Sequence, residues 1–308
     1  MTSDDASPRP LVFFATYRER PGLTEDDQLF ARALERRSAR VRAAVWDDPA
    51  AAWSSAAAVV IRSTWDYHHR LDEFLAWLDR VGAATMLNND ARVVRWNSHK
   101  SYLAELAHRG VAVIDTVFAN ARTPFDLDQI ARRHGWDDLV VKPAVSASAH
   151  ETRRFAGDAR GDARAHLDRL LATRDVMVQP YLAELAEQGE LSLLFARGQF
   201  THAVRRRSAL VDGHIMPKSA PAVAPPNALS SAERVLATAS ILTGVAPNDN
   251  LYARVDLAPS AGDFMLLELE MIEPSLFLRD VPHAAEQFAA ALMSTLATRQ
   301  IPNGERSP

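Results

Sequence analysis

The sequence contains no cysteine, which excludes a disulfide framework, thiolate catalysis and iron–sulfur clusters. It also lacks an apolar run near the length of about 20 residues that a membrane-spanning helix needs. The first ten residues, MTSDDASPRP, are polar and acidic and are unlike a secretory signal. We therefore expect a cytoplasmic protein with no membrane partner.

A strong charge of one sign is missing too. The formal net charge is −4, so the chain has no basic footprint for nucleic acid or an anionic membrane, and we expect no nucleic-acid partner. The ten histidines are scattered, and the adjacent pair His68 and His69 cannot face the same way on a regular strand or helix. We therefore predict that the chain has no zinc site.

Lysine is scarce. Of the 35 basic residues, three are lysines (Lys100, Lys142 and Lys218), which leaves 32 arginines. The two cations are largely interchangeable on solvated surfaces, whereas a compact ammonium group is required at particular sites. Each lysine is therefore a candidate functional residue, with chance survival as the alternative.

The length of 308 residues and the hydrophobic fraction of 47% fit a globular protein of two or three lobes that share a cleft. The first part alternates strand-like and helical patterns, which predicts an open α/β sheet that ends near residues 85–89. The predicted strands cover residues 11–16, 41–46 and 56–63, and the predicted helices cover residues 26–39 and 71–81. A further helix is predicted over residues 98–110, with Ser98 as its N-cap and Gly110 at its end.

A small second lobe is predicted from about residue 116 to residue 181. Its strands are expected over residues 115–119, 139–144, 151–156 and 176–181, and its helices over residues 126–135 and 163–173. The chain should continue with a hairpin that turns at Arg197 and Gly198 and a proline-rich loop over residues 217–228. The remaining predictions are a helix over residues 231–244, a hairpin over residues 252–272, a helix over residues 284–297, and disordered tails at both ends.

The stretch FMLLELEMIEPSLFL, residues 264–278, contains three glutamates in an otherwise apolar run. A buried carboxylate needs a counter-charge or a metal, because leaving it unpaired is costly. In a strand, Glu268 and Glu270 share one face, whereas Leu267, Leu269 and Met271 fill the other. A pair of glutamates that simply faces water is the alternative.

The preceding strand, YARVDLA, supplies partners for these glutamates. Its alternation puts Tyr252, Arg254 and Asp256 on one face, from which Arg254 and Asp256 can meet Glu268 and Glu270 across the hairpin. Three carboxylates and an arginine on one sheet face suit magnesium ions that bridge phosphate oxygens.

With the phrases RSTWDY, VVRWNSHKSYLAEL and LELEMIEPS, these features resemble the ATP-grasp superfamily, in particular its glutathione-synthetase-like members. The resemblance covers nearly the whole chain and implies an α/β (α+β) ATP-grasp fold of three lobes. The implied division is an N-terminal α/β domain over residues 1–95, a central ATP-grasp lobe with a linker helix and a lid over 96–182, a C-terminal lobe with the metal site over 183–300, and a tail over 301–308.

The resemblance also implies ATP and Mg²⁺ as cofactors and assigns roles to residues. Lys100 and Lys142 are implied to contact the phosphates, and Arg254 to stabilise charge on an acyl phosphate. The implied adenine contacts come from the segment VQPYL (Gln179, Tyr181 and Leu182), the ribose contact is Glu190, and the metal ligands are Asp256, Glu268 and Glu270. Glu270 stands where many members of the superfamily have asparagine.

Several further residues are candidates with open alternatives. Arg62, Asp66 and Tyr67 follow a predicted buried strand and either bind the amino and carboxylate groups of a substrate or form a structural salt bridge. Within the run 205–207, a basic residue is implied to face the γ-phosphate, and we select Arg205 over Arg206. Glu273 and Lys218 are further substrate candidates, with turn capping as the alternative for Glu273.

Within the superfamily, the phrases VIRSTWDYHHRLDEFLAWL and LELEMIEPSLFL look most like the group containing the cycloserine-forming O-ureido-serine cyclo-ligase. This implies an ATP-dependent carbon–nitrogen ligase of antibiotic biosynthesis that acts on a small amino-acid-like substrate. One departure is the segment 143–154, which has no glycine where phosphate-covering loops are often glycine-rich.

Two other functions remain open. The chain is alternatively a ligase that joins two amino acids or extends a peptide, or a nucleotide-binding protein that has lost catalysis, for which the glycine-free loop is the motive. The sequence also leaves homo-oligomerisation open.

Overall fold

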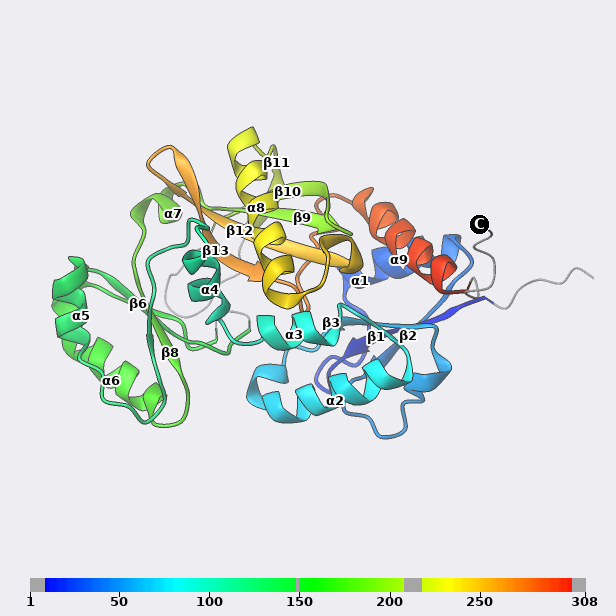
Figure 1. Cartoon of the computed structure of the whole chain (residues 1–308), viewed down its shortest axis with the longest axis horizontal. Coiled ribbons are helices and arrows are strands. Elements are labelled where there is room, and N and C mark those ends of the chain that lie inside the picture. Colours follow the sequence, from blue (N-terminus) through cyan, green and yellow to red (C-terminus); the bar gives the residue numbers. More distant parts are fainter. Residues whose placement is uncertain (1–8, 148–149, 208–217, 301–308) are drawn as a thin grey trace, which may run out of the picture.

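The computed structural model describes residues 9–147, 150–207 and 218–300, which fold into three sheets (Figure 1). The N-terminal sheet is parallel, as predicted, with the strand order β2-β1-β3-β4. Its strands are β1 (Leu11–Thr16), β2 (Arg40–Val45), β3 (Ala58–Ser63) and β4 (Met86–Asn88).

Helices cover both faces of this parallel sheet. Alternate residues of β1 point to opposite faces and therefore contact different helices. Phe14 packs against α1 (Glu25–Arg36) and α9 (Ala284–Gln300), whereas Phe13 belongs to a separate core with α2 (Leu71–Ala84). Burial on both faces explains the continuous apolar runs of these strands.

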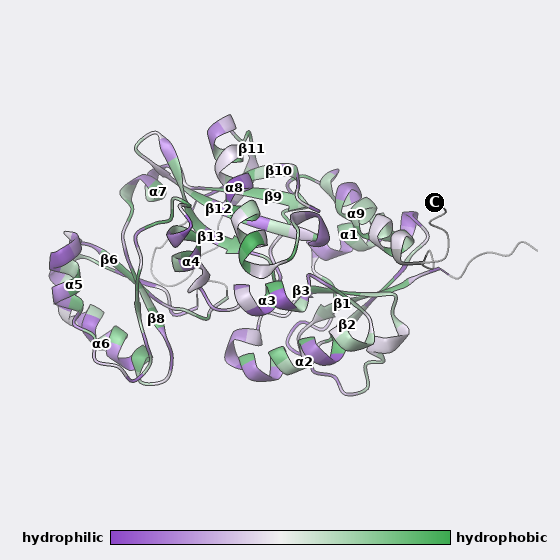
Figure 2. Cartoon of the chain, in the orientation of Figure 1, coloured by the Kyte–Doolittle hydropathy of each residue, from purple (hydrophilic) through white to green (hydrophobic). Residues whose placement is uncertain are grey.

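The second sheet is antiparallel, with the order β5-β8-β6-β7, and lies at the left of Figure 1. Its strands are β5 (Val117–Ala119), β6 (Leu139–Pro143), β7 (Arg153–Phe155) and β8 (Val176–Pro180). Two helices, α5 (Leu127–His134) and α6 (Arg160–Leu171), share its core. Figure 2 shows both helices with purple and green segments, as expected for elements that bury one face.

The third sheet, in the middle of the molecule, is antiparallel and has the order β11-β10-β9-β12-β13. Its strands are β9 (Glu190–Ala196), β10 (Gln199–Arg207), β11 (Lys218–Ala222), β12 (Tyr252–Ser260) and β13 (Asp263–Glu270). One face buries Leu193, Val255 and Leu269 in a core that includes residues of α8 (Pro226–Thr243). The other face is left for polar residues and for α9.

The predicted helix over residues 98–110 is wrong in its start. Two short helices meet there, α3 (Ala91–Asn97) and α4 (Tyr102–His108), so Ser98 is the C-cap of the first and Ser101 is the N-cap of the second. Asp90 caps α3 by accepting from the Arg92 amide, a signal that the sequence interpretation overlooked.

Two further elements were missed. The proline-rich segment contains the strand β11. Proline is tolerated there because β11 is the edge strand in the described part of its sheet. The connection after β8 contains α7 (Ala183–Gln188). The short 3₁₀ helices are η1 (Trp53–Ser55), η2 (Tyr67–His69), η3 (Gly157–Ala159) and η4 (Pro247–Asp249).

Among the described residues, no helix has both the length and the apolar character required to cross a membrane. The predicted disorder of residues 1–8 and 301–308 lies outside the described residues. The domain limits inferred from the sequence remain a prediction.

Candidate active site

The hairpin of β12 and β13 brings the predicted carboxylates together. Arg254 lies opposite Glu270 and Asp256 lies opposite Glu268, which confirms the predicted cross-strand meeting. One oxygen atom from each of Asp256, Glu268 and Glu270 lies within 4.8 Å of the other two. Such a set of carboxylate oxygens suits a hard divalent cation, whereas their role as ligands remains a prediction.

Asp256 is fully buried and surrounded by donors. Its carboxylate accepts from the Ser192 hydroxyl at 2.6 Å, from Arg206 Nη2 at 2.8 Å and from Arg254 Nη2 at 2.9 Å. Burial by itself raises the pKa of Asp256, but the two guanidinium groups outweigh it, so the net pKa is lowered. Asp256 is therefore ionised at neutral pH.

Two lysines act on the charge of Glu268. Its Oε1 is 2.6 Å from Lys100 Nζ. Burial raises the pKa of Glu268, but the charges of Lys100 and then Lys142 lower it below its ordinary value. Burial also lowers the pKa of Lys142 to about 8, against the attraction of Glu268. The two predicted phosphate lysines thus act on the same carboxylate, Lys100 from the turn before α4 and Lys142 from β6.

Glu270 and Glu273 complete this acidic group. Glu270 Oε1 is 2.5 Å from Arg254 Nη2, yet burial and the neighbouring carboxylates leave its pKa raised. Burial, followed by the charge of Glu270, raises the pKa of Glu273 to about 8. A bound cation would relieve this mutual repulsion, so the donor set fits a divalent metal.

The edge of β13 is fixed by side chains from the preceding helices. Asn97 donates to the Leu269 carbonyl and accepts from the Met271 amide, each at 2.8 Å. The Tyr102 hydroxyl donates to the same Leu269 carbonyl at 2.9 Å and accepts from the Leu269 amide at 3.0 Å. These hydrogen bonds pair backbone groups at the edge of β13 and fix the position of the strand that carries Glu268 and Glu270.

The structure brings Arg206 to the site and turns Arg205 away from it. Arg206 contacts Asp256 and lies 2.5 Å from Glu190 Oε1, whereas Arg205 donates to the Gln188 and Gly189 carbonyls at 3.2 and 3.4 Å. The selection of Arg205 is therefore not supported by the geometry. Neighbouring strand residues face opposite ways, and three consecutive arginines carry no signal of which one faces in.

Two contributors to this arrangement were missed by the sequence interpretation. Ser192 donates to Asp256 and accepts from Arg206 Nε at 3.1 Å, and a serine next to Glu190 on β9 gave no signal. The Phe277 ring lies under the guanidinium groups of Arg206 and Arg254, 5.5 and 5.6 Å from its centroid. Phe277 comes from the loop after β13, so only the tertiary fold reveals it.

Glu190, the predicted ribose contact, starts β9. Burial raises its pKa to about 7, against the charge of Arg206. The preceding Gly189 has a φ of 76°, and a Cβ there would lie 2.4 Å from the Arg206 carbonyl oxygen. Glycine is therefore required for the close approach of β9 and β10 at this point.

The predicted adenine segment follows β8. Gln179 is buried and donates to the Thr116 hydroxyl at 2.8 Å, and the Tyr181 amide donates to the Asp138 carbonyl at 3.0 Å. The Tyr181 ring lies 3.5 Å from the Arg154 guanidinium carbon, and Leu182 is the N-cap of α7. A nucleotide role for these residues remains a prediction.

The substrate candidates fall into different environments in the structure. Arg62 is buried in an ion pair of 2.7 Å with Asp27, and Asp66 accepts from Trp46 and Arg70. These contacts favour the structural alternative for both. Tyr67 is buried. Burial raises the pKa of Tyr67 well above its ordinary value, and the charge of Glu273 is the next largest cause. Lys218 is exposed on β11, opposite Arg207.

The histidines give a result that the sequence interpretation excluded. His68 and His69 lie on the 3₁₀ helix η2, and their ring centroids are 3.9 Å apart. His150, from the connection between β6 and β7, joins them. The argument that His68 and His69 cannot face the same way was wrong, because it assumed a regular strand or helix, whereas both residues lie on a 3₁₀ helix. The prediction of no zinc site stays a prediction.

Comparisons with known proteins agree with this fold. Residues 12–89 match the family model described as D-cycloserine synthetase DcsG, N-terminal domain. Cycloserine biosynthesis protein DcsG from Streptomyces lavendulae is 35% identical over 263 residues, which cover 82% of this chain and 87% of that protein.

Solved structures extend the likeness to the whole fold. The crystal structure of D-cycloserine synthetase DcsG has a TM-score of 0.85 and 30% identity, and the match covers 93% of this chain and 99% of that one. The ATP-grasp ligase PsnB, solved with minimal precursor, Mg and ADP, has a TM-score of 0.61 and 17% identity over 93% and 97% of the two chains, a likeness of fold alone. The chain therefore belongs to the D-cycloserine synthetase group of the ATP-grasp ligases.

Proposed function

We propose that the protein uses ATP and Mg²⁺ to activate a carboxylate as an acyl phosphate and then to form a C–N bond. The observation that carries this proposal is the grouping of Asp256, Glu268 and Glu270 within 4.8 Å of one another, beside Lys100. A protein nucleophile is not needed for this chemistry, because positioning and charge stabilisation supply most of the rate.

The charge of the site suits a metal–nucleotide complex. The site has one carboxyl group more than it has cations: the acids are Asp256, Glu268, Glu270, Glu273 and Glu190, and the cations are Lys100, Lys142, Arg206 and Arg254. Magnesium, when bound by the three clustered carboxylates, would supply charge neutralisation at the phosphates. One ATP with two Mg²⁺ ions has no net charge. Binding of this complex therefore leaves the total charge of the site unchanged.

We assign the chain's own residues as follows. Lys100 and Lys142 bind and orient the phosphates from two sides, and Arg254 stabilises the charge that develops on the transferred phosphoryl group. We assign Arg206 to this task in place of Arg205, because Arg206 contacts Asp256 at 2.8 Å. Gln179, Tyr181 and Leu182 hold adenine, and Glu190 holds the ribose.

The similarity to the cycloserine biosynthesis protein DcsG supports a proposal for the substrate. We propose O-ureido-D-serine, whose carboxylate is activated and whose oxygen-bound nitrogen then displaces phosphate, with closure of the D-cycloserine ring. Hydrolysis of the ureido carbonyl consumes one water and releases ammonia and carbon dioxide. Tyr67 and Glu273 are the substrate candidates that we retain, since the charges of Glu273, Glu270 and Glu268 all act on the Tyr67 hydroxyl and raise its pKa.

The test is phosphate release from Mg-ATP with O-ureido-D-serine as the sole added substrate. We expect release by the parent protein, loss of it in Glu268→Ala, and retention in Glu233→Ala, which removes an exposed carboxylate on α8. Release that requires a second amino acid would favour an intermolecular ligase. ATP binding without turnover on any substrate would instead favour a nucleotide-binding protein that has lost catalysis.

A further inference from the structure

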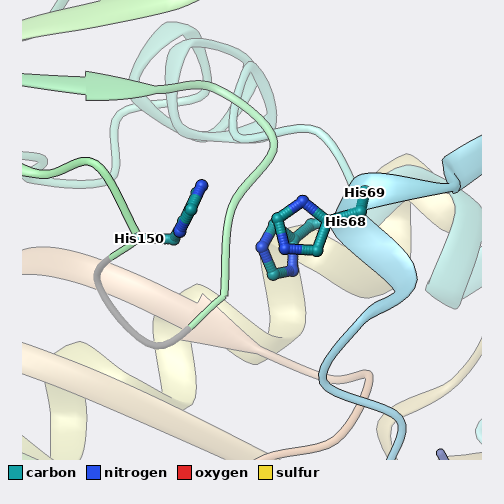
Figure 3. Close-up of side chains that lie close together, drawn as sticks. All are labelled: His68, His69 and His150. Atoms are coloured by element: carbon teal, nitrogen blue, oxygen red, sulfur yellow. The ribbon is translucent and has the colours of Figure 1, made fainter. Parts of the chain in front are cut away.

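Three histidines from distant parts of the chain form a compact cluster. His68 and His69 belong to η2, after β3 of the N-terminal lobe, and His150 lies in the connection between β6 and β7. Figure 3 shows the His68 and His69 rings next to each other on one segment and the His150 ring on the other. The centroid of the His150 ring lies 5.2 Å from that of His68 and 5.0 Å from that of His69. One ring nitrogen from each histidine lies within 4.8 Å of the other two.

The backbone on both sides of the cluster is anchored. Asp66, which precedes η2, accepts from Trp46 Nε1 at 2.8 Å and from Arg70 Nη2 at 2.7 Å. Glu151, which follows His150, pairs with Arg169 at 2.7 Å and Arg174 at 3.3 Å. Both neighbouring carboxylates thus pair with arginines, and Glu151 Oε2 also lies 3.8 Å from His150 Nε2. The three imidazoles are the metal ligands that this site offers.

His68 is a half-buried residue whose ring nitrogens lack a partner among the described residues. Both of its ring nitrogens are buried, and neither makes a hydrogen bond of ordinary geometry with any residue in the described part of the chain. Burial, followed by the nearby His69 and His150, lowers the pKa of His68 to about 4, despite the backbone of Trp65 and the carboxylate of Asp66. A neutral imidazole keeps a free lone pair, which is the form that binds metals.

The geometry is within reach of a tetrahedral site. A zinc ion with nitrogen ligands at about 2.1 Å needs those nitrogens about 3.4 Å apart, so modest ring rotations close the gap from 4.8 Å. His69 is exposed, which leaves a route for the ion and a fourth position for water. Three imidazoles favour a zinc-class cation over magnesium, which prefers oxygen ligands.

We propose that His68, His69 and His150 bind a zinc-class divalent cation that cross-links the β6–β7 connection to the N-terminal lobe. This site has no ligand in common with the carboxylate site. It lies on the same connection as Ser146, whose carbonyl accepts from Lys100 Nζ at 3.1 Å. The cross-link would therefore tie His150, eight residues after Lys142, to the N-terminal lobe.

The first test is zinc binding by the metal-free full-length chain, measured by competition with a chromophoric zinc indicator while Mg²⁺ saturates oxygen sites. We expect one zinc ion per chain, with affinity lowered at least about tenfold in His69→Gln and His150→Gln. His108→Gln, at an exposed histidine on α4, and Glu268→Gln should bind zinc like the parent. Unchanged affinity in both cluster variants, or loss of binding in Glu268→Gln, overturns the site.

The second test reads the cross-link itself. Zinc should slow tryptic cleavage after Arg153 and Arg154 at least about tenfold in the parent and should not slow it in His150→Gln. Zinc binding without this protection overturns the cross-link. Because His69 is exposed and His150 is half-buried, their glutamine variants are expected to fold, and circular dichroism checks that they do.

Discussion

Replacing Arg206 with glutamine removes the cation that links two buried carboxylates. Arg206 lies 2.5 Å from Glu190 and 2.8 Å from Asp256. Asp256 keeps Arg254 at 2.9 Å, whereas Glu190 loses the positive charge that most opposes the effect of its burial. Breaking a buried pair costs about 3–5 kcal/mol, and the retained Arg254 and partial exposure reduce this to about 2 kcal/mol, or about 4–8 °C in Tm.

The effect on turnover should be larger than the effect on stability. Removing one preorganised charge from a phosphoryl-transfer site typically lowers kcat about 100- to 1000-fold. The assay is a coupled measurement of ADP release, with thermal unfolding recorded on the same samples. Arg206→Lys should recover part of the rate, since it restores a point charge without the planar fork of arginine.

Arg205→Gln is the matched control, because it changes the adjacent residue of the same strand. Arg205 contacts two backbone carbonyls outside the carboxylate group, so kcat should stay within about threefold of the parent. If Arg205→Gln loses as much activity as Arg206→Gln, or if Arg206→Gln keeps its kcat, the assignment is refuted.

Three further predictions concern single groups of the site. Burial lowers the pKa of Lys142 to about 8, so KM for ATP should rise about tenfold between pH 7 and pH 9.5 as the ammonium is lost. In Lys142→Arg the KM for ATP should not change over this pH range. An equal rise in the parent and the variant excludes Lys142 as the titrating group. Glu268→Gln should raise the Mg²⁺ concentration needed for half-maximal activity at least about tenfold. Asp263→Asn, at the exposed tip of the hairpin, should leave that concentration unchanged. An unchanged Mg²⁺ requirement in Glu268→Gln contradicts the role of Glu268 as a metal ligand. Burial raises the pKa of Glu273 from 4.5 to about 8, so ionisation of this carboxyl group destabilises the folded state increasingly between these two pH values. Glu273→Gln should therefore raise the free energy of unfolding by about 2–4 kcal/mol at pH 9 and leave it unchanged at pH 4. Equal denaturant unfolding curves for parent and variant at pH 9 would contradict this prediction.

The sequence by itself determined what depends on local periodicity. The alternation of β12 and β13 put Arg254, Asp256, Glu268 and Glu270 on one face, and the register across the hairpin confirmed their meeting. This was predictable because the two strands are joined by a short turn, so their pairing follows from neighbouring residues. The scarcity of lysine likewise drew attention to Lys100 and Lys142, which approach Glu268 in the fold.

The tertiary structure decided every feature that joins segments far apart in the chain. It selected Arg206 over Arg205, paired Arg62 with Asp27, and brought His150 to His68 and His69. The face of the sheet on which the Arg206 side chain lies depends on how β10 pairs with β9. The histidine cluster depends on the contact between a 3₁₀ helix and His150, which is 81 residues after His69. Such contacts arise from the packing of whole lobes, and no local sequence pattern encodes them.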